Sequence, residues 1–471
     1  MKKTLFIALG AVAIAVAFLV SLQLKKGQRV ALIIETHLLP APSAKSLHPE
    51  LARRIVELNE RTTEGSDPID ALAKLGRLYH ANGYLNHAWQ TYRILIELDR
   101  TNPLWPHRLA SIVSSFGQLD DALPLYATSI ELDPDYLPSR ILLGDTYFKL
   151  NRFEEATDVF QRVLEKDSAN SFALFGQARV ALAQADIAQA RRLLEAARRF
   201  NNRIGGDLLA DIYERQGETQ KARALLHEIT WSSHVNISDP WVDDIVSDCY
   251  DSFEVAMAAG KAGRAGDTAG AIRLLEKAVR LDSLDHNAHN HLAELYLAQK
   301  SVDQAVKAYQ NCTKIAPTFW EGWAGLISIA WNSGDHAKAT ELIDQAIALC
   351  PDSYVINNYK GDSLITENRP QEAIPYFEKT TRLVPENAVG YNYLARAYIS
   401  LGQSEKAHEQ LLRALEAEPT NPLSLKLICL YYIVEADQPK AEQYMDRAFR
   451  SPRFSEADLG NLQGMFDKRF K

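Results

Sequence analysis

Three histidines close together in the sequence are the first candidates for chemistry, because imidazole is the commonest protein ligand for metal ions. His286 and His289 are three positions apart, so they would share one face of a helix. His291 lies two positions further on, which is about 200° around a helix axis. The three side chains therefore do not converge, and we expect ordinary polar helix positions with no bound metal.

The four cysteines do not suggest a reactive site either. They are far apart and include no C-x-x-C pair, which argues against a zinc ribbon or a thioredoxin-like redox site. We expect them to be small packing residues. They are Cys249, Cys312, Cys350 and Cys429. No Ser/His/Asp, Cys/His or paired-carboxylate arrangement stands out. We therefore expect no catalytic residue and no cofactor, and we expect that the protein is not an enzyme.

The composition is that of a folded protein. The chain has 471 residues, of which 46% are hydrophobic and 24% charged. This length exceeds one ordinary core, so several domains or a repeat array are expected. The net charge of -8 comes without a basic stripe, which disfavours a nucleic-acid partner.

The N-terminus contains an apolar run, residues 5–24, between Lys2 and Lys3 on one side and Lys25 and Lys26 on the other. A helix of this length spans about 30 Å, enough to cross a bilayer. A cleaved signal peptide is the rival interpretation, but its apolar part is usually only about 7–15 residues long. We therefore predict a single-pass membrane protein anchored through residues 5–24. Lysines on both sides leave the orientation open; we favour an extracytoplasmic (periplasmic) body over a cytoplasmic one.

The rest of the chain is organised by a pattern that is clear around Gly144. Tyr147 follows three residues later, and Ala156 and Phe160 follow at the spacing of a second helix. The small residues allow two amphipathic helices to approach closely, with a tight turn at Asn151 between them. The same pattern returns 34 residues away in either direction.

One small residue, at the start of each second helix, tracks the repeats. Eight of its ten successive intervals are 34 residues, and the other two are 32 and 49. Another small residue usually stands twelve positions earlier, and a proline often closes the unit and stops the second helix. The tracking residues are Ala88, Ala122, Ala156, Ala190, Ala222, Ala271, Ala305, Ala339, Ala373, Ala407 and Ala441.

This spacing resembles the tetratricopeptide repeat (TPR) family, whose unit is a 34-residue helix–turn–helix. The resemblance covers about residues 69–450 and includes about 11 units. It implies an all-α fold, a right-handed superhelical solenoid, here preceded by the predicted transmembrane helix. Ile327 and Cys429 depart from the pattern, since a small residue is usual at their positions.

The 49-residue interval marks an insertion between two arrays. Asp239 and Pro240 are a good N-cap and first helical residue, and we expect the helix to continue from Pro240 through Met257 into unit 6. The predicted organisation is residues 1–29, anchor; 30–68, tether and short amphipathic helix; 69–229, units 1–5; 230–251, insertion; 252–450, units 6–11; and 451–471, capping helix.

The family resemblance also implies a binding surface. In TPR proteins the first helices line an extended concave groove, mainly through unit positions 2, 5, 9 and 12. Asparagines at position 5 could bind a peptide backbone, because an amide side chain both donates and accepts hydrogen bonds. The predicted partner-binding residues are Arg77, Asp145, Phe148, Phe172, Phe175, Arg179, Asp211, Asn290, Glu294, Trp331, Asn358, Asp362, Asn392 and Arg396.

The sequence therefore predicts a membrane-anchored scaffold that binds a peptide or protein partner in its groove. The basic clamp of chaperone-tail binders is absent, since Lys426 at position 5 is followed by Leu430 at position 9. The alternative is a self-assembling structural component of a cell-envelope complex, which would use the array ends or the joint between Trp231 and Trp241. Homo-oligomerisation is left open.

Overall fold

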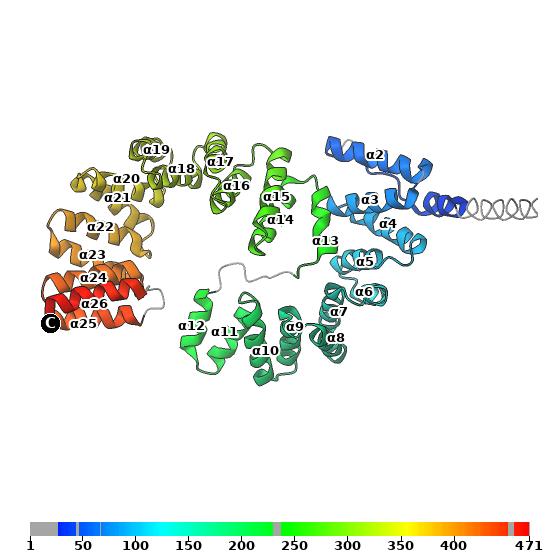
Figure 1. The fold of residues 1–471 in the computed structure, drawn as a ribbon, viewed down its shortest axis with the longest axis horizontal. Helices are drawn as coiled ribbons and strands as arrows, with labels where there is room; N and C mark the ends of the chain where they lie inside the picture. Colours follow the sequence, from blue (N-terminus) through cyan, green and yellow to red (C-terminus); the bar gives the residue numbers. More distant parts are fainter. Residues whose placement is uncertain (1–26, 44–46, 66, 229–236, 451–455, 471) are drawn as a thin grey trace, which may run out of the picture. The chain divides into compact units, whose positions relative to one another are not determined.

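The protein was analysed as a computed structural model that describes residues 27–43, 47–65, 67–228, 237–450 and 456–470. Within these ranges the chain is built from α-helices and contains no strand, which confirms the all-α class (Figure 1). The chain divides into two compact units, Met1–Val255 and Ala256–Lys471. Each is described by itself below.

The first described residues of the first unit, 27–37, are helical, where a tether was expected from residue 30 on. Ile34 is 1% exposed and belongs to a core cluster with Leu51 and Ile55, and this burial explains why the segment folds as a helix. Helix α2 (Pro49–Glu64) follows and packs on the first helix of the repeats.

Five helix pairs complete the repeats of the first unit (Figure 1). In each pair the two helices are antiparallel neighbours joined by a short turn. They are α3 (Pro68–Ala81) with α4 (Leu85–Leu98), α5 (Leu104–Ser115) with α6 (Leu119–Leu132), α7 (Leu137–Lys149) with α8 (Phe153–Lys166), α9 (Ser171–Ala183) with α10 (Ile187–Phe200), and α11 (Gly206–Arg215) with α12 (Thr219–Glu228).

Six more pairs follow, and then a last helix, α26 (Glu456–Phe470), whose Leu462 and Phe466 are buried against the final repeat. The pairs are α14 (Ser252–Arg264) with α15 (Thr268–Leu281), α16 (His286–Ala298) with α17 (Val302–Ile315), α18 (Trp320–Asn332) with α19 (His336–Leu349), α20 (Tyr354–Thr366) with α21 (Pro370–Leu383), α22 (Ala388–Ser400) with α23 (Ser404–Ala417), and α24 (Pro422–Val434) with α25 (Gln438–Phe449).

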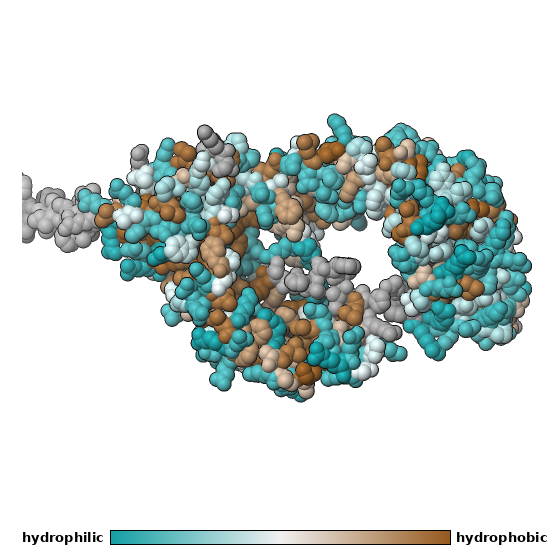
Figure 2. All heavy atoms as spheres, turned by 180° about the vertical axis from the view of Figure 1, so that it is seen from behind, coloured by the Kyte–Doolittle hydropathy of each residue, from teal (hydrophilic) through white to brown (hydrophobic). Residues whose placement is uncertain are grey.

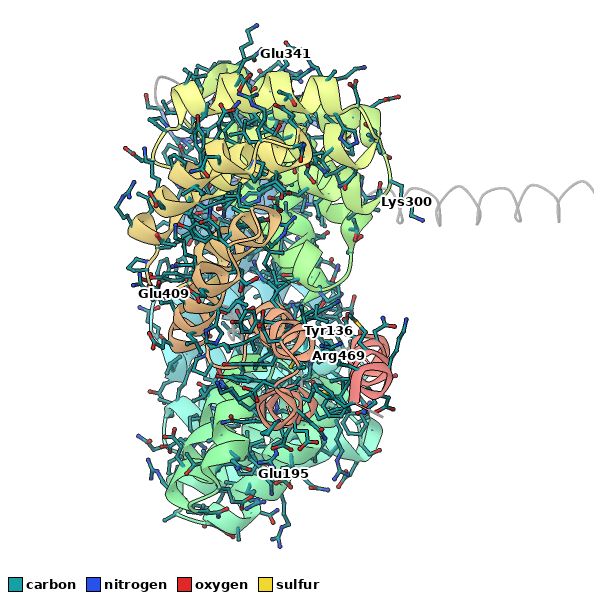
Figure 3. The ribbon with its side chains drawn as sticks, turned by 90° about the vertical axis from the view of Figure 1, so that its left-hand side faces the viewer. Tyr136, Glu195, Lys300, Glu341, Glu409 and Arg469 are labelled. Atoms are coloured by element: carbon teal, nitrogen blue, oxygen red, sulfur yellow. The ribbon has the colours of Figure 1, made fainter. Side chains whose placement is uncertain are left out.

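The turn inside each of the eleven pairs has one residue with positive φ, always at the same repeat position. A left-handed residue ends the first helix and redirects the chain, and glycine or asparagine adopts it most easily. Lys300, labelled in Figure 3, is one of three exceptions. The residues are Gly83, Gly117, Asn151, Ala185, Gly217, Gly266, Lys300, Gly334, Asn368, Gly402 and Ala436.

Small residues are required where the two helices of a pair meet. All eleven tracking alanines are 0% exposed. A Cβ atom added to Gly361 would lie 2.3 Å from the ring of Phe377 in the same pair, and one added to Gly176 would lie 2.3 Å from the ring of Phe160 in the preceding pair. The aromatic ring therefore fills the space that the glycine leaves. The face drawn in Figure 2 is mainly hydrophilic, with hydrophobic residues interspersed.

The insertion does not form the expected long helix. Helix α13 (Pro240–Asp243) does begin at Pro240, but it passes into the 3-10 helix η2 (Asp244–Asp248), and residues 249–251 are not helical before α14. Phe253 and Met257, which were expected to continue its apolar stripe, are 66% and 55% exposed. Ile245 and Cys249 of the expected stripe are buried, but the stripe does not continue along one helix, because the segment is held by contacts with distant residues.

The predicted single-pass membrane localisation is corrected. In the part of the chain that the structure describes, no helix is both long enough and apolar enough to cross a membrane. The predicted span, residues 5–24, lies outside the described residues.

Candidate functional site

The insertion contributes a segment that lies across the first helices of its own unit. We call residues 237–250 the return segment. It contains four aspartates and no lysine or arginine. It contacts α2, α3, α5 and the start of α7, and its hydrogen bonds to these elements join residues from 103 to 196 positions apart in the sequence. The contacts are described from its first residues to its last.

Asp239 is a buried anchor of the return segment, at 7% exposure. Its carboxylate lies 2.8 Å from Nε2 of His107 and accepts a hydrogen bond of 2.6 Å from the Tyr136 hydroxyl. His107 is fully buried, and its Nδ1 lies 2.8 Å from Oγ of Ser139. Burial alone would raise the pKa of Asp239, but the bonds from His107 and Tyr136 outweigh it and lower the pKa. The carboxylate therefore binds the repeats instead of capping α13.

Trp241 makes the main aromatic contact. Its ring stacks on Tyr136, with 3.5 Å between centroids and 5° between planes, and it meets His107 edge-on at 5.4 Å. Tyr136 is labelled in Figure 3. The backbone of Trp241 is also bound: its N–H donates to the Tyr136 hydroxyl at 3.0 Å, and its carbonyl accepts from Nε of Arg108 at 2.7 Å. Ring and backbone together fix its position.

Two further aspartates pair with arginines on the first helices α5 and α3 and on the preceding helix α2. Asp244 lies 3.0 Å from Nη2 of Arg108 on α5 and 3.1 Å from Nη1 of Arg77 on α3. Asp248 lies 2.6 Å from Nε of Arg77 and 2.8 Å from Nη1 of Arg54 on α2. Charge-assisted bonds of this kind are stronger than neutral ones. The aspartates and the basic residues therefore alternate along the helix face.

The end of the segment is held through its backbone. The side-chain oxygen of Asn82 accepts from the N–H of Tyr250 at 2.7 Å, and its nitrogen donates to the carbonyl of Asp248 at 2.9 Å. The Tyr250 ring stacks on His48, 5.2 Å between centroids. At the other end, Ile237 packs on the apolar cluster of units 3 and 4. The segment therefore runs opposite to the order of the repeats.

The predicted groove residues of units 3 and 4 form a cluster of their own. Arg179 pairs with Asp145, one repeat earlier, at 2.6 Å. The guanidinium carbon of Arg179 also lies 4.0 Å from the Phe148 ring centroid and 5.7 Å from that of Phe175. Phe172 is half-buried and packs on two core clusters.

Other charged residues predicted at position 9 also have partners within the repeats. Arg396 lies 3.1 Å from Asp362 of the preceding unit. Asp211 pairs with the next turn of its own helix at 2.8 Å, and Glu294 lies 3.2 Å from His291.

The three asparagines predicted to bind a peptide backbone are buried, at 2–7% exposure. Asn358 accepts from the hydroxyl of Thr380 at 2.8 Å, and Asn392 accepts from Ser424 in the next repeat at 2.9 Å. Asn290 donates to Glu294 at 3.0 Å. The bonds of Asn358 and Asn392 thus join neighbouring helices, whereas that of Asn290 stays within α16. Trp331 packs edge-on against a histidine at 5.4 Å, and its partner-binding role stays a prediction.

The other candidates for chemistry are held apart. His286 packs on an aromatic ring, while His289 points to a backbone carbonyl. In the described ranges, no group of three His, Cys, Asp or Glu side chains could hold a metal ion. All four cysteines are free and buried. Burial raises the pKa of Cys312 to about 11 and that of Cys429 to about 12, which suppresses their reactivity.

Sequence reasoning identified only Arg77 among the residues that hold the return segment. It missed Arg54, Asn82, Arg108 and, at position 5 of unit 2, His107. The available signal was charge: residues 237–250 of the insertion contain four aspartates and no lysine or arginine, and the N-terminal part of the chain carries these basic residues. Nothing in the repeat pattern could indicate which helices it would meet.

Comparison with known proteins supports the repeat assignment. Family models described as tetratricopeptide repeat match residues 115–174, 364–428 and 257–318. Two curated relatives, both "DnaJ homolog subfamily C member 3", match 103 residues: the Bos taurus protein at 26% identity and the Rattus norvegicus protein at 27%. The match covers 22% of this chain and spans only 20% of the length of either relative.

Solved structures similar to the chain include yeast Tom70, at 15% identity and a TM-score of 0.40, covering 85% of this chain and 96% of that one. The Cut9–Hcn1 hetero-tetramer of the APC/C gives 13% identity and a TM-score of 0.40, covering 91% and 99%. Neither similarity bears on function. The matched family models and the eleven helix pairs in one register show that this chain is a tetratricopeptide repeat protein.

Proposed function

We propose that this protein is a scaffold that binds peptide or protein partners along the faces formed by the first helices of its repeats. One observation carries the proposal: the first helices of units 1–3 hold the return segment by ion pairs, ring stacking and backbone hydrogen bonds. A face that holds one extended segment in this way has the chemistry to hold another. The right-handed superhelix expected for the repeats would extend such a face along each array.

Binding of this kind would come from many modest contacts, without a catalytic centre. Each ion pair or stacked ring contributes little by itself, but a rigid array presents them in register, so little ordering energy is lost when a partner docks. We therefore propose a role in protein interaction and not in catalysis.

Site-specific photo-crosslinking in the full chain tests the proposal. A photoreactive residue replaces Glu294 on first helix α16 or, as a matched control, Glu341 on second helix α19; both side chains are 54% exposed. Glu341 projects away from the ribbon in Figure 3. We expect a discrete crosslinked partner from Glu294 and none from Glu341. Equal crosslinking from both positions, or none from either, would contradict the proposal.

The self-assembling alternative makes a different prediction, a stable oligomer of the full chain in light scattering at micromolar concentration. Trp241 of the joint already stacks on Tyr136 within its own unit, so this ring is not available as an intermolecular contact while the return segment is docked. A monomeric mass would count against the alternative.

A further inference from the structure

We infer that the first-helix face of units 1–3 is a binding site for an acidic peptide that carries an aromatic residue, and that the return segment occupies it as an internal ligand. This inference rests on the proposed function and specifies the partner chemistry for one part of the array. Three features of the contacts carry it.

The first feature is charge complementarity. Asp239, Asp244 and Asp248 each meet a basic side chain, and these side chains come from the first helices α5 and α3 and from α2, the helix that precedes the repeats. The face therefore selects carboxylates at repeated intervals. A basic peptide would be repelled by the same residues, which gives the site a sign preference.

The second feature is an aromatic anchor. The Tyr136 ring and the His107 edge receive Trp241, while the Tyr136 hydroxyl and Arg108 bind the backbone beside it. A flat ring beside a backbone clamp recognises an aromatic residue in a chain that is not part of a long helix. The partner class is thus an acidic segment with a tryptophan or similar ring.

The third feature is that the segment lies on the repeats and is not part of their core. Only three of the fourteen residues of the segment are buried, Asp239, Ile245 and Cys249, and the other eleven are partly or fully exposed. The side chain of Asp244 is 48% exposed. The repeats form their own core from residues such as Tyr92 and Tyr126. The contacts of the segment are therefore those of a docked ligand.

Tethering sets how strongly the internal ligand competes. A segment joined to its site by a short stretch of chain acts at an effective concentration of about a millimolar. An outside peptide of the same chemistry then binds only when the segment is released, and its apparent affinity falls with the fraction of open sites. Only a partner that binds more strongly than the return segment, or that also contacts further repeats, would therefore occupy the site.

The test uses the full chain and a fluorescent synthetic peptide with the sequence of residues 237–250. An opened variant carries Asp244→Lys and Asp248→Lys, which leaves every residue of the repeat face intact. We expect the peptide to bind the opened variant at least about tenfold more tightly than the unmodified chain in fluorescence anisotropy. A charge-matched control, Asp303→Lys with Asp352→Lys in the second unit, should bind like the unmodified chain.

Specificity is tested with two further changes. Adding Arg54→Glu and Arg77→Glu to the opened variant should abolish binding, and a peptide with its four aspartates changed to asparagine should bind at least about tenfold more weakly. Failure of a correctly folded opened variant to bind the peptide would overturn the inference. So would equal binding by the unmodified chain or by the asparagine peptide.

A second measurement applies if the opened variant does not fold. Hydrogen exchange of residues 242–248 in the unmodified chain is followed while an isotopically heavy peptide is added to millimolar concentration. Faster exchange of the segment supports displacement, and unchanged exchange overturns the inference. Crosslinking at Glu294 would still test the general scaffold role, so the two proposals fail separately.

Discussion

The first helices of units 1–3 and those of units 9 and 10 have the same repeat positions and use them differently. In the first region, Arg77 at position 9 and His107 at position 5 bind a segment from far along the chain. In the second, Asp362 pairs with Arg396 across one repeat, and Asn358 is buried against Thr380. The repeat determines the position of each residue on its helix. The segments packed nearby determine whether its side chain binds a distant segment or joins two helices of the array.

The largest effect is expected from removing the aromatic ring at the centre of a repeat. Phe160 and Phe377 are 1% and 0% exposed and fill equivalent positions in the two units. Each change to alanine should destabilise its own unit by about 3–5 kcal/mol. Hydrogen exchange should show lost protection only in the unit that carries the change, each variant being the control for the other. Equal loss in both units would show that they do not unfold separately.

The next effect concerns the anchor of the return segment. Asp239→Ala leaves His107 buried without its carboxylate, and we expect the docking free energy of the segment to fall by about 3 kcal/mol. The measurement is hydrogen exchange of residues 240–248. Asp335→Ala removes a helix N-cap in the second unit and should cost about 1 kcal/mol without changing that exchange. Slow exchange in the Asp239 variant would show that the other contacts suffice.

A smaller effect should identify asparagines that join helices. Asn358→Ala leaves the Thr380 hydroxyl without its side-chain acceptor in a buried site, and should destabilise the second unit by about 1–2 kcal/mol in urea unfolding. Asn332→Ala, at an exposed position of α18, should change stability by less than about 0.5 kcal/mol. Equal, small effects would favour the original prediction that Asn358 serves partner binding.

The smallest effect is a pH dependence confined to the first region. His107, Tyr136 and Asp243 face Asp239, and the bonds lower its pKa below the ordinary value of 3.8 despite burial. Its contribution to docking should therefore be complete above pH 3.8 and be lost as the pH falls through the lower, folded value. Exchange of the segment measured from neutral to acid pH tests this. Loss of docking already near neutral pH would contradict it.

Much of the fold could be predicted because its determinants are local. Ala156 and Phe160 stand at fixed spacing from Gly144, and the turn at Asn151 has the left-handed φ of 59° that a tight turn needs. These contacts fall within one repeat, so one period of sequence contains them. Ile327 and Cys429 depart from the small-residue pattern without changing the repeat fold, and both are 0% exposed despite their larger side chains.

The candidate site could not be predicted in the same way. Asp239 was recognised as a helix start, but its carboxylate binds His107, 132 residues away. The apolar spacing from Trp241 to Met257 suggested one long helix, yet Trp241 is held by Tyr136. Helical spacing shows which side chains would share one face of a helix. It does not show whether residues far away in the sequence bind the same side chains in another conformation. The asparagines were placed on the correct helices, but the partners of Asn358 and Asn392 in neighbouring helices were not foreseen.

The turns inside the repeats have a mechanical consequence. Eight of the eleven use glycine or asparagine, while Ala185, Lys300 and Ala436 adopt the left-handed region with a larger side chain. Such a residue stores about 1–2 kcal/mol of backbone strain. If the two ends of the chain were pulled apart, units 4, 7 and 11 would be expected to yield first. The chain would then lengthen in steps, as units 4, 7 and 11 unfold before the other units.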